Sequence, residues 1–307
     1  MPAPNLLPHP FARTILDVHG DAGAEWLGRL PDLIADCAGR WSLAVQPPFG
    51  NLSYHYVAPA IRSDGTEAVL KLGVPSPDFK AEAEALKVFG GHGAVLLLDE
   101  DTEGNALLLE RLRPGTTLAE LADDPQATSI AAEVMRQLWP PVPPQHAFPS
   151  IADLAAGLAK MRRRFGGTTG PLPRRLVEEA EALFTELIAS MAPPVLLHGD
   201  LHHGNILAAR RQPWLAIDPF GVIGEPECEV GALLRNPQAR LRADGQPGRT
   251  LSRRLDQLAD ELAFDRARLR GWGVAQAVLS AWWSLEDHGS GWEWSIACAE
   301  WLAAAGG

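Results

Sequence analysis

The spacing of apolar residues along the chain changes near residue 42. Before that point apolar side chains recur at every third or fourth position, which predicts an amphipathic helix over residues 11 to about 40. Beyond it the apolar residues fall into short runs bounded by turn-forming residues, at Leu43–Val45, Tyr54–Ile61 and Glu67–Leu72. Such runs are typical of strands joined by hairpins, so we expect a small antiparallel sheet here.

Helical spacing then returns once within the first third of the chain. Residues Asp78–Phe89 predict a helix, and two later apolar runs, Ala94–Leu98 and Ala106–Glu110, predict further strands. The sequence Arg113-Pro114-Gly115 ends this region, because proline and glycine interrupt both kinds of periodicity. We therefore expect a lobe boundary at this point.

The remainder of the chain is mainly helical. Helical spacing covers residues 227–236, 249–262, 266–288 and 292–304, and short runs that predict strands lie at 195–198, 206–208 and 214–217. We predict an α+β fold with two lobes. Residues 1–112 form an N-terminal lobe with a small antiparallel sheet and a helix, and residues 113–307 form a mainly helical C-terminal lobe.

Composition narrows the class of protein. With 307 residues, of which 46% are hydrophobic and 21% charged, the chain has the make-up of a folded globular protein. No apolar run reaches transmembrane length and the first ten residues lack a secretion signal, so we expect no membrane partner and a cytoplasmic location. The three cysteines, Cys37, Cys228 and Cys298, are widely spaced and form no metal-binding pattern, which favours reduced thiols.

The net charge of −11 bears on the class of partner. A nucleic-acid binder needs a positive surface to meet phosphates, so we expect no nucleic-acid partner. A cationic or polyhydroxy small molecule suits an acidic protein better, although the same charge also serves solubility. Four glutamates are candidate contacts to such a substrate, namely Glu225, Glu227, Glu229 and Glu286, with ordinary surface charge as the open alternative.

Two carboxylates and one carboxamide lie at the ends of the short apolar runs of the second lobe. Asp200 and Asn205 lie at opposite ends of one loop, each directly after a glycine, Gly199 or Gly204, and Asp218 follows the run 214–217. A phosphoryl-transfer site needs one aspartate to orient a hydroxyl and accept its proton, and two further oxygen donors to hold Mg²⁺. We predict Asp200 as the catalytic base and Asn205 and Asp218 as the metal ligands. Each residue alone is also a common turn former.

Three histidines in the same loop raise the alternative of a zinc site. Zinc ligands usually come in spaced pairs, and the adjacent His202 and His203 cannot easily face one ion. We expect instead that His198 is a buried imidazole hydrogen-bonded to the backbone, which holds the loop in shape.

A lysine within an apolar strand points to the site of the nucleotide. Burial of the charged Lys71 ammonium within the strand Ala68–Leu72 costs free energy unless an anion pairs with it, and a nucleotide phosphate could be that anion. Helical periodicity places Glu82 on the apolar face of the next helix, so we predict that Glu82 pairs with Lys71, with Glu84 as the alternative.

Two further segments are candidate nucleotide contacts. The turn that contains Asn51 and Ser53 could present backbone N–H groups to phosphates, although an ordinary hairpin is the open alternative. Backbone groups from Glu110 to Leu112, just before the lobe boundary, could face an adenine ring.

The order of these motifs resembles the aminoglycoside phosphotransferase family. The loop His198–Leu207 resembles its catalytic loop, and Asp218-Pro219-Phe220-Gly221 resembles its metal-binding segment. Finer likeness at residues 64–71, 107–115 and 217–226 points to the streptomycin 6-kinase and hydroxyurea-resistance branch, over residues 40 to 237. The resemblance implies a protein-kinase-like fold, ATP and Mg²⁺ as cofactors, and Lys71 on the nucleotide phosphates.

The chain departs from that branch at two positions. Phe220 lies where lysine is frequent, and Glu229 lies where the helix after the metal segment usually carries an aspartate. Neither change removes a catalytic group, but both bear on the identity of the acceptor.

The expected activity is ATP-dependent transfer of the γ-phosphate to a hydroxyl of streptomycin or a related aminoglycoside. The alternatives are a metabolic kinase for a small alcohol or amino alcohol, a protein kinase, which the missing activation segment disfavours, and a nucleotide-binding protein without turnover. The acceptor hydroxyl, the choice of ATP over GTP and the oligomeric state are not readable from these residues.

Overall fold

The structure, a computed structural model, describes residues 7–306 and divides into two compact units. Unit 1 comprises the chain up to Gly91 together with Val95–Arg113, and unit 2 comprises His92–Ala94 and the chain from Pro114 onward. No helix among the described residues is long and apolar enough to cross a membrane.

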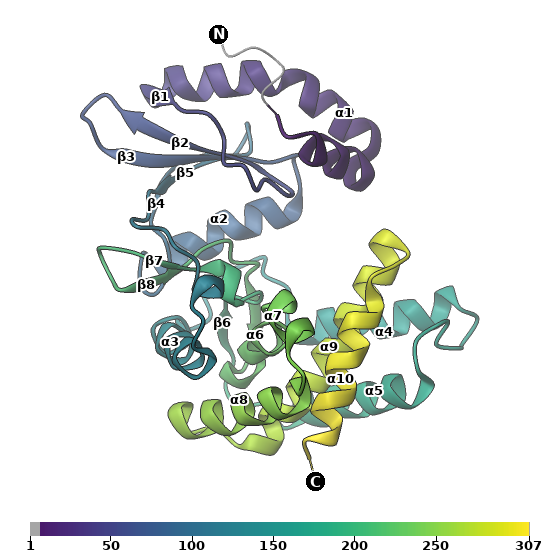
Figure 1. The fold of residues 1–307 in the computed structure, drawn as a ribbon. Coiled ribbons are helices and arrows are strands. Elements are labelled where there is room, and N and C mark those ends of the chain that lie inside the picture. Colours follow the sequence, from purple (N-terminus) through teal and green to yellow (C-terminus); the bar gives the residue numbers. More distant parts are fainter. Residues whose placement is uncertain (1–6, 307) are drawn as a thin grey trace. The chain divides into compact units, whose positions relative to one another are not determined.

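The described residues of unit 1 form one sheet and two helices (Figure 1). Its elements are α1 (His9–Arg40), β1 (Leu43–Val45), β2 (Tyr56–Arg62), β3 (Glu67–Leu72), α2 (Pro77–Phe89), β4 (Leu97–Asp101) and β5 (Ala106–Glu110). The strands form an antiparallel sheet in the order β1-β2-β3-β5-β4, as the hairpin pattern predicts.

The two faces of this sheet receive different helices. One face, which includes Ala58, Leu70 and Leu108, forms a buried core with the apolar side of α1. Lys71 on β3, Leu107 on β5 and Glu100 on β4 are register partners in one row across the sheet. Because side chains alternate along a strand, this row faces the opposite side, where α2 lies (Figure 1).

Two predictions for unit 1 are wrong in detail. The strand predicted at Ala94–Leu98 begins only at Leu97, as β4, and Ala94, which belongs to unit 2, makes an isolated bridge to Ala216 of the same unit. The long first helix is broken at Gly20, whose φ of 54° and ψ of −129° are not helical. Only glycine adopts such angles at little cost, so the apolar periodicity continues across a kink.

Unit 2 is mainly helical. Its helices are α3 (Asp124–Gln137), α4 (Ile151–Arg164), α5 (Arg174–Ala189), α6 (Val230–Leu234), α7 (Gln238–Ala243), α8 (Pro247–Leu262), α9 (Arg266–His288) and α10 (Trp292–Ala304), with 3-10 turns at Leu118–Glu120, His203–Asn205 and Pro226–Glu229. Its strands are β6 (Val195–Leu197), β7 (Ile206–Ala208), β8 (Trp214–Ala216) and β9 (Val222–Gly224). The expected helix 227–236 is therefore a 3-10 turn followed by the short α6.

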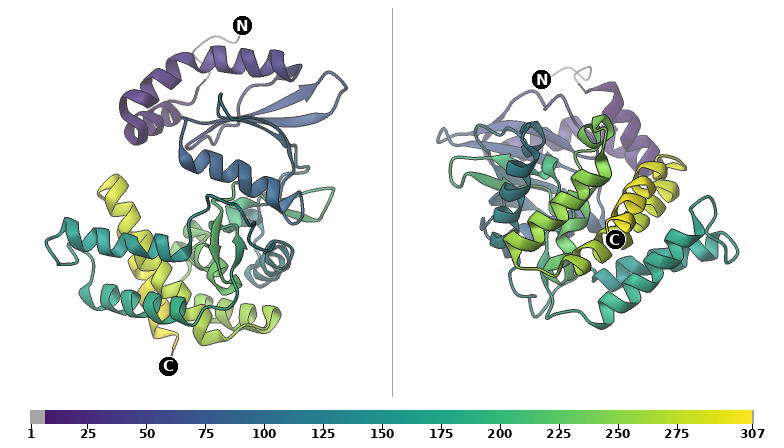
Figure 2. Two further views of the ribbon diagram at one scale, coloured as in Figure 1. Left: turned by 180° about the vertical axis from the view of Figure 1, so that it is seen from behind. Right: turned by 60° about the horizontal axis from the view of Figure 1, so that its bottom comes forward.

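Helix α9 is the centre of this unit. It packs against α4, α5, α6, α8 and α10, and its Trp272 and Trp282 are fully buried. Figure 2 shows α10 beside α9 and the pair α4–α5 alongside them.

A buried ionic cluster connects α3 to α8. Asp124 accepts hydrogen bonds from Arg253 and Arg254, and Arg254, which is fully buried, also donates to the carbonyl oxygens of Leu233 and Asn236. A buried guanidinium is tolerated only with such a set of acceptors, so Asp124 is a structural anchor of unit 2.

Candidate active site

Two short ladders hold the loop that carries the predicted catalytic residues. Strand β6 pairs with β9, and β7 pairs with β8, both antiparallel. The loop 198–205 therefore leaves one ladder and enters the other, while the segment 217–221 connects the same two ladders in the opposite direction. Each ladder thus places one end of the loop next to one end of the segment.

Backbone hydrogen bonds tie the loop to the segment at both ends. The N–H of Ile217 donates to the carbonyl of Asn205 at 2.9 Å. The N–H groups of Phe220 and Gly221 donate to the carbonyl of His198 at 2.9 and 3.0 Å. The segment that carries Asp218 is consequently fixed to the loop that carries Asp200 and Asn205.

The imidazole of His198 makes a third connection. Its Nε2 lies 2.9 Å from the carbonyl oxygen of Ile217, which can only accept, so this nitrogen carries the proton. Its Nδ1 accepts the backbone N–H of Asp200 at 3.3 Å. Burial lowers the pKa of His198 to about 4, so the ring is neutral near pH 7. The predicted role of His198 as a buried, backbone-bonded imidazole is confirmed.

Glu229 anchors the start of the same loop. This side chain is 2% exposed, and its two oxygens accept the backbone N–H groups of His198 and Gly199 at 2.8 and 2.9 Å. Burial raises the pKa of Glu229 to about 7, and the two N–H groups oppose this shift. Gly199 itself has a φ of 84°, and a Cβ there would lie 3.0 Å from the side chain of Val222, so a glycine is required.

The three predicted polar residues occupy the positions that these bonds define. The Asn205 amide nitrogen donates to the carbonyl of Asp200 at 3.0 Å, which turns the amide oxygen to the other side as a free acceptor for a cation. Asp218 has a φ of 57°, an uncommon conformation for a residue other than glycine. Such backbone strain clusters at functional sites, where the surrounding structure holds it in place.

The electrostatics of Asp200 suit a base that is half exposed. Desolvation raises the pKa of its carboxyl group and Asp218 acts in the same direction, whereas His202 and Arg235 oppose the shift. His202 lies beside it, with Nε2 3.8 Å from the Asp200 carboxylate and Nδ1 accepting the N–H of Gly204 at 3.0 Å. A raised pKa strengthens a carboxylate as a proton acceptor.

The zinc alternative finds no support in the described part of the chain, which contains no cluster of three or more histidine, cysteine, aspartate or glutamate side chains suited to a metal ion. The donor set at Asn205 and Asp218, an amide oxygen and a carboxylate, instead suits a hard cation such as Mg²⁺, which keeps several of its own waters.

Unit 1 contains the predicted lysine–glutamate pair. Lys71 Nζ lies 2.6 Å from Glu82 Oε1 and 2.7 Å from Oε2, and the two side chains are 2% and 6% exposed. Glu84, the alternative partner, instead pairs with Lys87 at 2.7 Å. The helical-face argument for Glu82 is therefore confirmed.

The other predicted nucleotide contacts also lie in unit 1. Asn51 and Ser53 are exposed in the loop between β1 and β2, and the ring of Phe49 in the same loop lies 4.5 Å from the guanidinium of Arg111. The carboxylate of Glu110 accepts the N–H of Leu96 at 3.2 Å, and Leu112 is buried. The structure thus brings the loop close to the segment Glu110–Leu112, through a cation–π contact that sequence reasoning missed.

The structure corrects the predicted acceptor contacts. Glu225 is fully buried, and its oxygens are taken up by Arg268, Trp272 and the N–H of Ala192. Glu229 has the anchoring partners described above. Glu225 and Glu229 are therefore interior residues, and their carboxylate oxygens are already bonded within the protein rather than open to a substrate.

Two of the four glutamates stay predictions. Glu227 is half-buried, which raises its pKa, and Glu286 pairs with Lys160 at 2.8 Å. The positions of the four glutamates in the sequence do not show which side chains point inward, because 3-10 and α-helical turns place successive residues on different faces.

Comparison with known proteins identifies the family. A family model described as aminoglycoside/hydroxyurea antibiotic resistance kinase matches residues 40–288. The chain belongs to this family. It is therefore a phosphotransferase that acts on a hydroxyl group, and the segments that carry Lys71, Asp200, Asn205 and Asp218 all lie inside the matched region.

Individual relatives of this kinase agree in length as well as in sequence. It is 35% identical over 282 residues to streptomycin 6-kinase of Streptomyces glaucescens, and the aligned region covers 92% of this chain and 91% of the relative. It is 34% identical over 284 residues to hydroxyurea phosphotransferase of Kitasatospora aureofaciens, which covers 92% of this chain and 81% of the relative.

A solved structure supports the fold. Aminoglycoside phosphotransferase APH(4)-Ia superposes with a TM-score of 0.65 at 15% identity and covers 91% of this chain and 99% of its own. The antiparallel sheet of unit 1 and the helices of unit 2 thus form the predicted protein-kinase-like fold.

Proposed function

We propose that this kinase transfers the γ-phosphate of ATP to a hydroxyl of streptomycin or a closely related aminoglycoside, which inactivates the antibiotic. The observation that carries the proposal is the hydrogen-bonded loop of unit 2, in which Asp200, Asn205 and Asp218 are held by His198 and by three backbone bonds. The acceptor is inferred from the relatives named streptomycin 6-kinase.

Asp200 is the proposed base. Its carboxylate would orient the attacking hydroxyl and take its proton as the oxygen–phosphorus bond forms. The bonds from its N–H to His198 and from Asn205 to its carbonyl fix the backbone on both sides of the side chain. This fixation matters because displacement of a reacting group by about 1 Å costs on the order of 100-fold in rate.

Asn205 and Asp218 are the proposed ligands for Mg²⁺. A bound Mg²⁺ would supply positive charge that neutralises the phosphate oxygens during transfer. The amide oxygen of Asn205 and the carboxylate of Asp218 fit such an ion, and the positive φ of Asp218 is a strained conformation of the kind that clusters at functional sites.

Lys71 is the proposed ligand for the nucleotide phosphates, positioned by Glu82. A lysine that is 2% exposed and bonded to both oxygens of one carboxylate has a fixed ammonium direction. Asn51, Ser53, Glu110 and Leu112 remain proposed contacts to the phosphates and the base. We further propose a cytoplasmic location, where ATP is abundant.

Hydroxyurea is the second candidate acceptor, because one relative of similar identity is named hydroxyurea phosphotransferase. The deciding experiment incubates the purified kinase with ATP and Mg²⁺ and, separately, streptomycin, hydroxyurea, other aminoglycosides and small metabolic alcohols. Product masses identify the acceptor, and fragmentation of the product locates the phosphate.

The proposal expects phosphorylated streptomycin as the product with the highest kcat/KM. Turnover of hydroxyurea or of a metabolic alcohol with none of streptomycin would refute the acceptor while keeping the chemistry. Binding of ATP without any product from any acceptor, even in hydrolysis assays, would refute the activity.

A further inference from the structure

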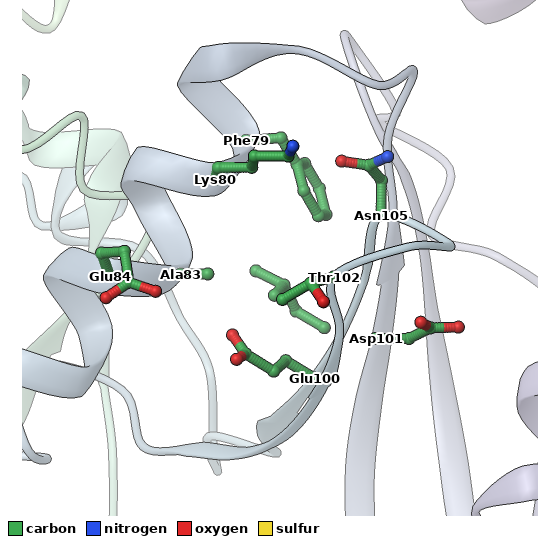
Figure 3. A pocket seen from close by; sticks show the side chains of 9 residues that line it. Phe79, Lys80, Ala83, Glu84, Glu100, Asp101, Thr102 and Asn105 are labelled. Carbon is green, nitrogen blue, oxygen red and sulfur yellow. The ribbon is translucent and has the colours of Figure 1, made fainter. Parts of the chain in front are cut away.

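Buried polar atoms without a hydrogen-bond partner occur in both units of the described chain. In unit 1 they include Asn105 Oδ1 and Glu100 Oε2, at opposite ends of a pocket of about 90 Å³ between α2 and the hairpin of β4 and β5 (Figure 3). Lys80 lines the same pocket, so its acidic groups have a cation beside them. In unit 2 such atoms lie in and beside the loop 198–205, where they include both ring nitrogens of His203 and Nη1 of Arg240.

His203 differs from the other two histidines of this loop. The ring nitrogens of His198 and His202 bond to backbone groups of the loop or of the segment 217–221. His203 is fully buried, and neither of its ring nitrogens has a partner among the residues that the structure describes. Burial and the nearby arginines lower the pKa of His203 to about 3, so the neutral ring has one N–H donor and one acceptor nitrogen. This ring therefore needs partners from outside the loop.

The buried ionic cluster of unit 2 supplies candidates for these partners. Arg254, Asp124 and Arg240 lie close enough for their charges to act on the imidazole of His203. Arg240 Nη1 is 3.6 Å from Asp124 Oδ1, too far for a hydrogen bond, and no other described residue accepts from it. Arg240 thus has a donor without an acceptor, and His203 has an acceptor without a donor. One hydrogen bond between them would satisfy both groups.

Arg240 also holds the turn against which the loop packs. Its Nη2 donates to the carbonyl oxygens of Ala119 and Leu121 at 2.9 and 2.5 Å. These carbonyls lie in and directly after the 3-10 turn Leu118–Glu120, which packs against the 3-10 turn His203–Asn205. A bond from Arg240 to the imidazole would therefore fix the second turn to a support that the ionic cluster already holds.

We propose that His203 is a positioning residue: Arg240 Nη1 donates a hydrogen bond to its imidazole, and this bond holds Asn205 in the orientation that binds Mg²⁺. Asn205 closes the same turn, because its backbone N–H donates to the carbonyl of His202 at 2.9 Å. Loss of a residue that orients a metal ligand lowers metal affinity by about 10–100-fold. The inference rests on the proposed role of Asn205 as a metal ligand, and its test separates the two.

Four variants test the link. His203→Phe keeps a buried ring but removes both nitrogens, and His203→Gln keeps one donor and one acceptor. Arg240→Lys keeps the positive charge but lacks the guanidinium and its Nη1. His146→Phe, at an exposed position between α3 and α4, is the matched control. Thermal unfolding shows that each variant is folded before it is measured.

The first readout uses the protein without nucleotide or metal. Hydrogen exchange of the Asn205 backbone amide reports opening of the turn, and exchange of Val278, in the buried part of α9, reports global unfolding. In His203→Phe we expect exchange at Asn205 to accelerate at least tenfold more than exchange at Val278. Equal acceleration at both amides would show a loss of stability alone and would overturn the proposal.

The second readout is the Mg²⁺ concentration for half-maximal transfer from ATP to the acceptor that wild type phosphorylates. We expect a rise of at least tenfold in His203→Phe and a similar rise in Arg240→Lys, a value within threefold of wild type in His203→Gln, and no change in His146→Phe. The double variant of His203→Phe and Arg240→Lys should match His203→Phe within twofold, because both replacements remove the same bond.

Three results would contradict the account in different ways. An unchanged Mg²⁺ titration in a folded His203→Phe protein would overturn the proposal. Effects of the two replacements that multiply in the double variant would overturn the link to Arg240. Wild-type turnover without Mg²⁺ would refute the proposed metal role of Asn205, and the exchange data would then decide whether His203 holds the turn.

Discussion

Replacing Glu229 by glutamine tests whether the anchoring of the loop controls catalysis. In wild type the two carboxylate oxygens accept two N–H groups, from His198 at 2.8 Å and Gly199 at 2.9 Å. A glutamine keeps one acceptor oxygen but presents an NH₂ group to the second backbone N–H. Donor then faces donor at a position that is 2% exposed.

The size of the effect follows from this loss. One charge-assisted hydrogen bond disappears and a backbone N–H is left unsatisfied, which costs about 1–3 kcal/mol of folding free energy. Because the loop leads directly into Asp200, a shift of about 1 Å at the base lowers kcat on the order of 100-fold. We expect Glu229→Asp, which keeps both oxygens on a shorter side chain, to lie between wild type and Glu229→Gln.

The assay combines steady-state kinetics with thermal unfolding at the assay pH. Glu293→Gln, at an exposed position of α10, is the matched control and should equal wild type in both measurements. A folded Glu229→Gln protein with kcat within about twofold of wild type would refute the anchoring argument, since the base would then keep its place without the second bond.

The pH dependence gives an independent readout of the same residue. Burial raises the pKa of Glu229 to about 7, above that of a carboxyl group in the unfolded chain. The folded protein therefore binds this proton more tightly, and the stability it contributes is complete below the unfolded-state pKa and falls as pH rises to about 7. Wild type should lose stability relative to Glu229→Gln over that window, and a difference that is independent of pH would contradict the assignment.

Three further predictions concern other parts of the molecule. Glu82→Gln should raise the KM for ATP at least tenfold and destabilise the protein by about 3 kcal/mol, because it leaves the buried Lys71 without a counter-charge. The control Glu84→Gln should change neither the KM in kinetics nor the stability in denaturant unfolding. Asp124→Asn should lower the stability of unit 2 by about 3 kcal/mol near pH 7, as measured by urea titration, because it leaves the buried Arg254 without its counter-charge. The arginines beside Asp124 lower its pKa although burial raises it, so the difference in stability from wild type should shrink as the pH falls through that pKa. Asp218→Asn should raise the Mg²⁺ concentration needed for half-maximal activity at least tenfold, and an unchanged Mg²⁺ titration would remove Asp218 from the metal site.

The parts of the site that sequence predicts well are those with a local backbone cause. The glycines directly before Asp200 and Asn205 and the proline after Asp218 already mark a tight loop and a strand end. Helical periodicity favours Glu82 over Glu84 as the partner of Lys71, and the structure contains that pair. Each of these inferences needs only a few neighbouring residues.

The parts that sequence does not predict depend on contacts between distant residues. Glu229 and Glu225 look like surface acids, and only tertiary packing shows that one binds the loop at His198 and the other binds Arg268. Ala94 has the apolar neighbours of a strand, yet it bridges Ala216 across more than a hundred positions because Gly93 accepts the N–H of that residue at 2.8 Å. No local pattern specifies such a partner.

The most direct test of the account compares wild type with Asp200→Asn in phosphorylation of streptomycin by ATP and Mg²⁺. Asparagine preserves the shape of the side chain and cannot accept the proton, so we expect phosphorylated streptomycin from wild type and a fall in kcat of about 10²–10⁴-fold in the variant, with ATP binding retained. Turnover of streptomycin by Asp200→Asn at the wild-type rate would contradict the central claim that this loop carries the catalytic base.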